Sequence, residues 1–392
     1  MKNVFKGFDY TLIITPLLLA CFGLIMIYSA SMVSTVVDGL ESTFYLKRQL
    51  LWFALSLLGF ILTALYPYQK YKEITFWVVL VSFGLLISVL IFGDTVNRAT
   101  RAISIFGINV QPAEFIKLTL IIYLASIYSK KQKYIDNFVY GVLPPLLLML
   151  MMIFLIVLQP DIGTAVIILL IGSTIILSSG IRSKHIIGLL LFAGALVLLL
   201  IPKLITDTRI ARVTGAYSPF QNPDSTGYHL IQSYIAISGG GVKGEGLGQS
   251  VQKLGYLWGA HTDFIMAVIA EELGIFGVLI TIGLLAIITL RGLYIAKKSK
   301  DSFGSLLAVG ISCMVAIQAC INLGAISGLF PITGVPLPFL SYGGSSLFVL
   351  MLAMGILNNI AKSVKMEEEK STTEETEPLN QYKYGRGRTW QM

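Results

Sequence analysis

Long apolar runs alternate with short polar connections along almost the whole chain. A helix needs about 20 apolar residues to cross the hydrocarbon core of a bilayer. Turn-forming pairs such as Tyr66-Pro67 and Ser179-Gly180 separate neighbouring runs. The pattern predicts an all-α integral membrane protein with ten transmembrane helices, near residues 10–32, 49–66, 74–92, 111–128, 138–158, 162–180, 186–202, 263–290, 304–327 and 343–361.

One long polar stretch interrupts this alternation, at residues 203–262 between the seventh and eighth runs. It contains too many apolar residues for a disordered segment, among them Ile231, Tyr234 and Leu254. Long loops in compact chains are usually functional. We therefore expect residues 203–262 to form a large loop that carries the active site.

The positions of Lys and Arg in the connections indicate how the chain lies in the membrane, because cytoplasmic loops are enriched in both. With the N-terminus inside, the 203–262 loop faces outward and both termini are cytoplasmic. Outside then lie Lys47, Arg48, Arg98 and Arg101. Inside lie Lys2, Lys6, Lys70, Lys72, Lys130, Lys131, Lys133, Arg182, Lys184, Arg291, Lys297, Lys298, Lys300, Lys362 and Lys365.

The composition excludes several classes of protein. Only 13% of the 392 residues are charged, about half of the roughly 25% found in soluble domains. Basic and aromatic residues do not alternate as on a nucleic-acid surface, so we expect no nucleic-acid partner. The three cysteines lie inside apolar runs and the three histidines are dispersed, so no metal cluster is predicted.

The last residues differ from the membrane unit, which we place at residues 1–365. Residues 366–378 contain six glutamates and one lysine, and Lys383, Arg386 and Arg388 follow. Such a charged segment predicts a disordered cytoplasmic tail. Docking of a partner and no role at all both stay open for this tail.

Ionisable residues inside membrane spans are costly and are candidates for function. Glu114 and Lys117 lie three apart on one helical face, as an internal ion pair or as substrate contacts. Asp161 follows Pro160 and can cap the next helix through the amides of Gly163 and Thr164, or act on substrate.

Asp263 lies where the outward loop meets the eighth run. Acidic residues favour helix N-termini, which gives a structural reading of this position. Asp263 is also placed where a lipid-linked substrate would meet a polar loop. Two turns deeper, Glu271 and Glu272 point about 100° apart, so at least one faces the bundle interior.

Residues 322–346 combine three prolines with repeated glycines at membrane depth. Non-helical backbone is tolerated there only where it is buried in protein or lines a wet cavity. The Gly343-Gly344-Ser345-Ser346 turn leads into a helix and can offer backbone amides to an anion.

Residues 10–362 resemble the SEDS family (shape, elongation, division and sporulation), the polytopic FtsW/RodA/SpoVE group. The resemblance rests on several motifs in the right order, and Gly246–Lys253 favours the division and sporulation branch. Arg101 is followed by Ala102 where the family usually has tryptophan. The motifs are Tyr28-Ser29-Ala30-Ser31, Lys47-Arg48-Gln49, Gln111–Leu118, Gln159–Ala165, His261-Thr262-Asp263-Phe264 and Pro331–Ser346.

The resemblance implies a peptidoglycan glycosyltransferase that polymerises lipid II at the outer face of the bacterial cytoplasmic membrane, for septal synthesis in cell division. It implies that Asp263 is the catalytic residue. It also implies a class B penicillin-binding protein as transpeptidase partner, together with other division proteins. We expect substrate contacts from Arg48, Arg101, Glu114, Lys117, Asp161, Lys253, His261, Ser341 and Ser345.

The family reaction inverts one anomeric centre and releases a polyprenyl diphosphate. One carboxylate suffices as the base, and Asp263 is the candidate. The diphosphate needs cations, which are either Arg and Lys residues, Arg212 among them, or a divalent metal such as Mg²⁺ or Mn²⁺. The sequence does not decide between these two.

Two other classes remain open. Ten spans with broken backbone and buried charges also suit a flippase that moves lipid II outward, although no inverted repeat is visible. A scaffold that recruits the transpeptidase without catalysis is the other reading. Synthesis of glycan from lipid II by the purified chain discriminates among the three.

Overall fold

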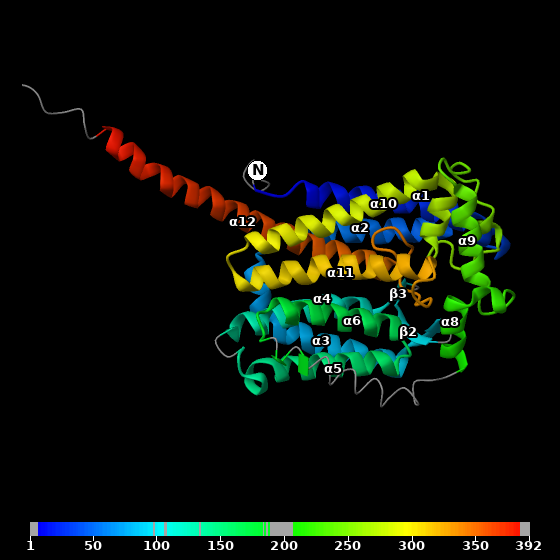
Figure 1. Ribbon diagram of the computed structural model, residues 1–392, viewed down its shortest axis with the longest axis horizontal. Helices are drawn as coiled ribbons and strands as arrows, with labels where there is room; N and C mark the ends of the chain where they lie inside the picture. The colour runs from blue at the N-terminus through cyan, green and yellow to red at the C-terminus, as the bar shows by residue number, and fades with distance from the viewer. Residues whose placement is uncertain are drawn as a thin grey trace, which may run out of the picture.

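The structure is a computed structural model that describes residues 7–96, 99–105, 108–132, 135–182, 184–185, 187–188 and 207–384. It is a bundle of long helices whose axes are nearly parallel (Figure 1). The helices of the bundle are α1 (Thr11–Val37), α2 (Phe44–Leu65), α3 (Tyr71–Phe92), α4 (Pro112–Lys130), α5 (Leu143–Leu158), α6 (Ile162–Ser178), α10 (Ile265–Lys298), α11 (Ser302–Ile326) and α12 (Gly344–Tyr384).

Within the described residues, eight helices are long and apolar enough to cross a membrane, and α6 is a shorter apolar helix of 17 residues. These elements confirm a multi-pass, mainly helical membrane protein and match nine of the predicted runs. The seventh run, 186–202, lies almost wholly outside the described residues. The number ten therefore stays a prediction.

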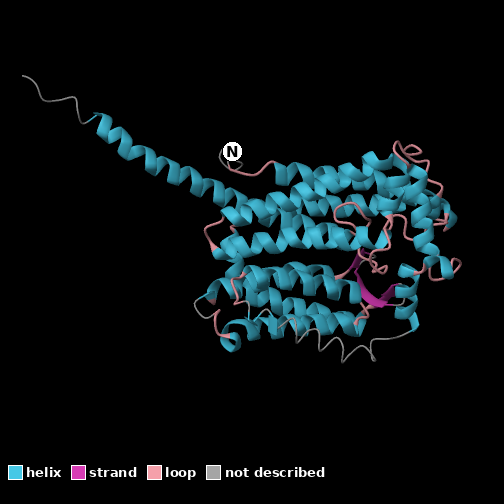
Figure 2. Ribbon diagram, in the orientation of Figure 1, coloured by secondary structure: helices cyan, strands magenta, loops and turns pink. Residues whose placement is uncertain are grey.

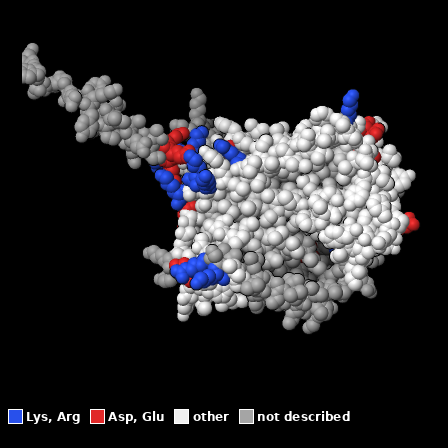
Figure 3. All heavy atoms as spheres, in the orientation of Figure 1, with Lys and Arg blue, Asp and Glu red and all other residues white. Residues whose placement is uncertain are grey.

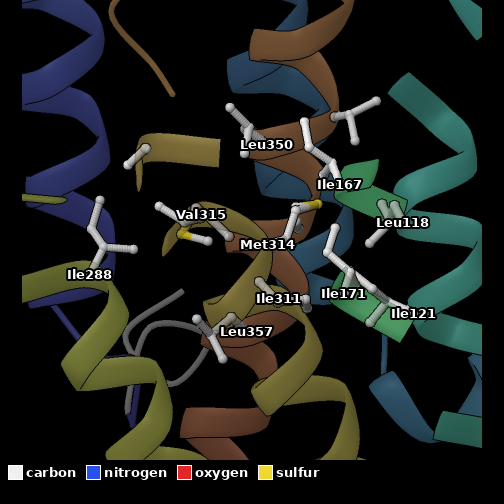
Figure 4. Packing of buried hydrophobic residues seen from close by; sticks show 14 of the residues in the cluster. Leu118, Ile121, Ile167, Ile171, Ile288, Ile311, Met314, Val315, Leu350 and Leu357 are labelled. Atoms are coloured by element: carbon white, nitrogen blue, oxygen red, sulfur yellow. The ribbon is translucent and has the colours of Figure 1, made fainter. Parts of the chain in front are cut away.

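The core lies where α11 packs against α4, α6 and α10. Ile121, Ile171 and Ile311 are fully buried at this junction (Figure 4). By contrast, α2 and α3 expose many apolar side chains, including Leu58 and Trp77. Apolar side chains on the outside of a helical bundle are what contact with lipid requires.

A small antiparallel sheet that the sequence did not predict connects α3 and α4 (Figure 2). It consists of β1 (Asp94–Val96), β2 (Ala99–Ile105) and β3 (Ile108–Val110), with β2 in the centre. Ile103 faces Val110 in the register of β2 and β3. The sheet lies at the end of the bundle where α4 begins.

The described part of the long loop is mostly ordered, not irregular. It contains α8 (Asp207–Tyr217), α9 (Tyr228–Gly240) and the short helical turns η4 (Pro219–Gln221) and η5 (Gln252–Leu254). Ser233 of α9 donates to the carbonyl of Ile326 over 3.1 Å, which ties the loop to the end of α11. Two further short helical turns, η1 (Tyr68–Lys70) and η3 (Phe138–Val142), lie at the other end of the bundle.

Lys and Arg gather at the end of the bundle from which α12 extends, and few lie at the loop end (Figure 3). The N-terminal chain is at the same end, because Asp9 N donates to Asn358 Oδ1 over 3.0 Å. The predicted orientation would place this basic end in the cytoplasm, and it stays a prediction. Lys2, Lys6, Lys133 and Arg98 belong to the prediction but lie outside the described residues.

Helix α12 continues beyond the predicted membrane unit. Residues 366–384, for which the charge pattern predicts a disordered tail, prolong α12 away from the bundle (Figure 1). Lys298 pairs with Glu368 over 2.9 Å where the helix leaves the bundle.

Candidate active site

A cavity of about 620 Å³ lies at the loop end of the bundle, between α2, the small sheet, the long loop and the start of α12. Three of the predicted site residues line it, namely Arg48, Asp263 and Ser345. Arg212 of α8 lines it as well. The cavity therefore combines one carboxylate with two guanidinium groups and a helix N-terminus.

The backbone around Asp263 is fixed at three consecutive carbonyl oxygens. The carbonyl of His261 accepts from Tyr342 N over 2.9 Å. Thr262 O accepts from Ser341 Oγ over 2.6 Å, and Asp263 O accepts from Asn322 Nδ2 over 2.8 Å. All three donors come from the end of α11 or from the segment before α12, so those elements set the position of Asp263.

Asp263 is not the N-cap residue of α10. The helix begins at Ile265, and its N-cap residue is Phe264. Asp263 is half-buried and lines the cavity. Asp263 therefore lies at the cavity, as a reacting group requires.

The N-terminus of α12 contributes backbone amides to the same cavity. The lining includes Gly343, Gly344, Ser345 and Ser346, and the first amides of a helix have no partner within that helix. The main chain lies close to Trp52, since a Cβ atom on Gly344 would be 2.1 Å from the indole. An anion at this place is favoured by the amides and by the helix dipole.

Arg48 lies at the start of α2, with its guanidinium 4.4 Å from the ring centre of Phe44. Its neighbour in the cavity wall is Tyr342. Burial raises the pKa of Tyr342, and the nearby Arg48 partly opposes that rise. The positive charge of Arg48 is thus held at the cavity by two aromatic residues.

His261, a predicted substrate contact, is part of an aromatic cluster behind the cavity wall. Its ring lies 4.4 Å from that of Tyr45 and 5.8 Å from that of Tyr342. Burial lowers the pKa of His261 to about 4. The imidazole is therefore neutral at physiological pH and supports Tyr342, which itself lines the cavity.

The predicted pair on α4 is an internal ion pair. Lys117 Nζ lies 2.7 Å from Glu114 Oε2, and both side chains are almost fully buried. Neither residue belongs to the cavity lining. Of the two readings from the sequence, the structure supports the self-neutralising pair.

Asp161 caps α6 through the amide of Thr164. The sequence also suggested the amide of Gly163, for which no such hydrogen bond is found among the described residues. The Asp161 carboxylate accepts from Thr164 N over 3.2 Å and from Thr164 Oγ1 over 2.9 Å. Gln111 links it to the cavity, because Gln111 Nε2 lies 3.5 Å from Asp161 Oδ2 and Gln111 N donates to Ser345 Oγ over 3.0 Å. Asp161 thus supports Ser345 indirectly.

Lys253 is buried away from the cavity lining. Its Nζ lies 2.8 Å from Glu272 Oε1 and donates to Ser29 Oγ over 3.1 Å. Glu271 accepts from Ser250 Oγ and from Val251 N, the latter over 2.9 Å. The two adjacent glutamates therefore fasten the loop that precedes Asp263 to α1 and α10.

A break in α10 completes this attachment. Gly274 has φ 63° and ψ −156°, which interrupts the helix. The carbonyls of Glu271 and Glu272 accept from Glu245 N over 2.9 Å and Gly246 N over 3.0 Å. A side chain on Gly274 would collide with the backbone of Val242, so glycine is required by both the φ angle and the close approach.

The side chain of Arg101 lies outside the described residues, and its backbone belongs to β2. The neighbouring Ala102 lines the cavity. The sequence pattern assigned no role to Asn322, Trp52, Tyr342 or His229, although the first positions Asp263 and the other three line the cavity. The polarity of Asn322 within an apolar run was the available signal.

Within the described residues, no three His, Cys, Asp or Glu side chains lie close enough to hold a metal ion. Asp263 is the carboxylate that lines the cavity. Mg²⁺ is often held by one or two carboxylates together with substrate phosphates. The residues present therefore fit a cation that Asp263 shares with a bound diphosphate, and not a site built from protein ligands alone.

Comparison with known proteins gives consistent matches over the whole chain. The model of the FtsW/RodA/SpoVE family, described as cell cycle protein, matches residues 9–366. The chain is 49% identical over 390 residues to the probable peptidoglycan glycosyltransferase FtsW of Bacillus subtilis (strain 168), covering 96% of each. It is 38% identical to the stage V sporulation protein E of the same organism, covering 90% of this chain and 97% of that protein.

Two solved structures have the same fold. One comes from work on the "structural coordination of polymerization and crosslinking by a peptidoglycan synthase complex", with TM-score 0.75, 26% identity and coverage of 92% of this chain and 99% of that chain. The other is the rod shape determining protein RodA of Thermus thermophilus, with TM-score 0.66, 25% identity and coverage of 91% and 97%.

Proposed function

The chain belongs to the FtsW/RodA/SpoVE family of cell cycle proteins, and we propose that the cavity around Asp263 is where it polymerises lipid II. The chain is a multi-pass membrane protein and a peptidoglycan glycosyltransferase. One observation carries the assignment of the site. Three carbonyl anchors hold Asp263 in a cavity that also contains Arg48, Arg212 and the start of α12.

In the proposed reaction, Asp263 takes the proton of a sugar 4-hydroxyl as that oxygen attacks an anomeric carbon. The bond between this carbon and the diphosphate oxygen breaks, and polyprenyl diphosphate leaves. One displacement inverts the α-linked donor to a β-1,4 bond. A single positioned base is sufficient for such a step.

The leaving diphosphate is placed against the positive part of the cavity. Arg48 and Arg212 supply charge, and the amides of Gly344 and Ser345 supply hydrogen bonds. Asp263 is the residue that would hold a divalent cation at this cavity, and such a cation would add charge stabilisation for the diphosphate. Glu114, Lys117, Asp161, Lys253, His261 and Ser341 support the walls of the cavity in this assignment.

A transpeptidase of the class B penicillin-binding type is the proposed partner, with other division proteins. The match to a synthase complex that couples polymerization and crosslinking supports it. We place the cavity outside the cytoplasmic membrane, both termini inside, and the protein at the division septum. The gathering of Lys and Arg at the opposite end of the bundle supports this orientation.

One reconstitution experiment can distinguish a polymerase of lipid II from a transporter of lipid II. The purified chain is reconstituted in liposomes with its transpeptidase partner, with and without Mg²⁺ or Mn²⁺, and both glycan strands and the sidedness of lipid II are measured. Glycan without net scrambling supports the proposal. Scrambling of lipid II with no glycan under any condition contradicts it and indicates a flippase.

A further inference from the structure

Residues 250–260, the part of the long loop nearest to Asp263 in the sequence, have their polar side chains inside and their apolar side chains outside. Ser250, Gln252 and Lys253 are only 2%, 7% and 3% exposed. The exposed large side chains of this segment are all aliphatic or aromatic, each at 52% or more. A loop surrounded by water shows the opposite arrangement, because burial of apolar side chains is favourable there. The exposed side chains are Val251, Leu254, Tyr256 and Trp258.

Two buried glutamates of α10 produce this arrangement. Glu271 accepts from Ser250 Oγ and, over 2.9 Å, from Val251 N. Glu272 Oε1 lies 2.8 Å from Lys253 Nζ. A charge buried without partners is costly, so the polar side chains of the loop turn inward to the two carboxylates. The apolar side chains between them are thereby directed to the outside.

Helix α1 shows at which depth of the membrane this segment lies. Lys253 Nζ donates to Ser29 Oγ of α1 over 3.1 Å, and η5 packs against α1. At the rise of an α-helix, Ser29 lies about 27 Å along the axis from Thr11. The hydrocarbon core of a bilayer is about 30 Å thick. Because Thr11 is at the basic end of the bundle (Figure 3), which marks one edge of the core, residues 250–260 lie at the other edge.

The exposed side chains of this segment continue the outer surface of α1. Ile25 and Tyr28, both within about one turn of Ser29, are 52% and 38% exposed. In a multi-pass membrane protein, such apolar side chains on the outside of the bundle face lipid. Tyr256 and Trp258 are of the two residue types that are enriched where hydrocarbon meets headgroups. The lipid-facing surface of α1 thus extends onto the loop.

We propose that Val251, Leu254, Tyr256 and Trp258 insert into the lipid leaflet at the loop end of the bundle and anchor the loop to the bilayer. The occupant of this surface is phospholipid, at the level where the acyl chains meet the headgroups. The contact forms without a partner protein.

The anchor also fixes the height of Asp263 relative to the bilayer. A tight turn joins Trp258 to Asp263. Within it, Gly259 O accepts from Thr262 N over 3.0 Å and from Phe264 N over 3.1 Å. A lipid-linked substrate carries its reacting groups close to the headgroups. The anchor therefore keeps the proposed base at the height of its substrate, a consequence that rests on the proposed function.

A spin label at Leu254 tests the lipid contact, with two positions of α1 as references. The full chain, in a variant without its three native cysteines, is reconstituted in phospholipid liposomes with one label at Leu254→Cys, Ile25→Cys or Asp38→Cys. Ile25 lies on the lipid-facing surface, and Asp38 is exposed beyond the end of α1. Collision rates with oxygen, which concentrates in lipid, and with a water-soluble nickel chelate are measured with and without the transpeptidase partner.

Without the partner, the ratio of oxygen to chelate collisions at Leu254 should be several-fold higher than at Asp38 and should approach the ratio at Ile25. A ratio like that of Asp38 overturns the lipid contact. Protection from the chelate that arises only when the partner is added also overturns it and indicates a docking surface for protein.

The native tryptophan gives a second measurement that requires no change of the cysteines. The fluorescence of Trp258 is obtained as the difference between the wild type and Trp258→Phe. Lipids brominated in the upper part of the acyl chain should remove most of this difference, and aqueous iodide should remove little of it. Stronger quenching by iodide than by brominated lipid would contradict insertion.

Leu254→Gln combined with Trp258→Gln tests the height of Asp263. Both side chains are exposed, so the thermal midpoint in detergent should be unchanged, whereas polymerisation of lipid II in liposomes should fall several-fold. Leu254→Met combined with Trp258→Phe should retain the rate of the wild type. Full activity of the glutamine variant would exclude a role of the anchor in the reaction. A wild type that makes no glycan with its partner would contradict the proposed function, while the label and the fluorescence would still decide the lipid contact.

Discussion

The side-chain amide of Asn322 donates to the backbone carbonyl of Asp263 over 2.8 Å, and the same nitrogen donates to Val335 O over 2.8 Å. Asn322 is 2% exposed, on α11. It therefore joins the segment that carries the proposed base to the segment that lines the cavity before α12. Loss of this nitrogen should therefore displace Asp263 in the cavity without changing the chemical nature of its carboxylate.

Asn322→Asp replaces a donor by an acceptor that faces two carbonyl oxygens. Buried groups left unsatisfied cost about 1–3 kcal/mol each, so we expect kcat for lipid II polymerisation to fall about 10- to 100-fold with little change in KM. Steady-state kinetics of the purified chain with its partner measure kcat and KM separately.

The control for that variant is Asn359→Asp, which also removes an amide donor to a carbonyl, that of Ala64, over 2.8 Å. Asn359 lies on α12 and is not part of the cavity lining. The variant should lower the thermal midpoint without a specific loss of kcat. Equal losses of kcat in both variants would contradict a positioning role for Asn322.

Gly344→Ala should disrupt the start of α12. Its new Cβ atom would be 2.1 Å from the indole of Trp52, so either the ring or the helix must shift. We expect a strong loss of polymerisation and of diphosphate affinity. Gly283→Ala, in an open part of α10 with no atom within 4 Å, should preserve activity and stabilise by up to about 1 kcal/mol. Normal diphosphate binding by Gly344→Ala would rule out an anion site at these amides.

Lys253→Met should destabilise the protein strongly. It leaves the Glu272 carboxylate fully buried without its cation, which typically costs about 3–5 kcal/mol. The double variant Lys253→Met with Glu272→Gln should recover most of the thermal midpoint, because no buried charge remains. Arg182→Met, at a pair with Asp136 that is about 60% exposed on both sides, should have little effect. A double variant no more stable than Lys253→Met would exclude the ion pair as the cause.

The lowered pKa of the buried His261 imidazole should make the stability of the protein depend on pH. Its pKa falls from the ordinary 6.5 to about 4 through burial, so between these values the unfolded chain binds a proton that the folded chain does not. Stability therefore rises with pH across this window and is lost as pH falls toward 4. His261→Phe retains ring contacts with Tyr45 and Tyr342 and should flatten this part of the curve of thermal midpoint against pH. An unchanged slope would assign the dependence to other groups.

The membrane segments could be predicted because the length of an apolar run directly reflects the thickness of the bilayer. Asp263 and Ser345 could be selected as candidates because their motifs stand at the ends of apolar runs. The roles of Lys253 and Asp161 could not be separated from substrate binding, since a buried ion pair and a cap use the same residue types as a ligand site. The small sheet at residues 94–110 was missed because its strands are short and carry no strong alternation.

The contribution of Asn322, Tyr342 and His229 depends on contacts between segments far apart in sequence. Asn322 lies 59 residues from the carbonyl that it binds, and His229 meets Phe264 only because α9 folds back over the start of α10. No local pattern encodes such a contact. The polarity of Asn322 within an apolar run marks that residue in the sequence, but the roles of all three residues could be recognised only once the fold had been determined.

Lipid II polymerisation by the purified chain with its transpeptidase partner, compared between the wild type and Asp263→Asn, tests the central claim most directly. Asn has nearly the same shape and keeps the three carbonyl anchors of residues 261–263, but it cannot accept the hydroxyl proton. We predict glycan strands from the wild type, and none from an Asp263→Asn protein with an unchanged thermal midpoint. Glycan synthesis by Asp263→Asn at the rate of the wild type would contradict the assignment of Asp263 as the base.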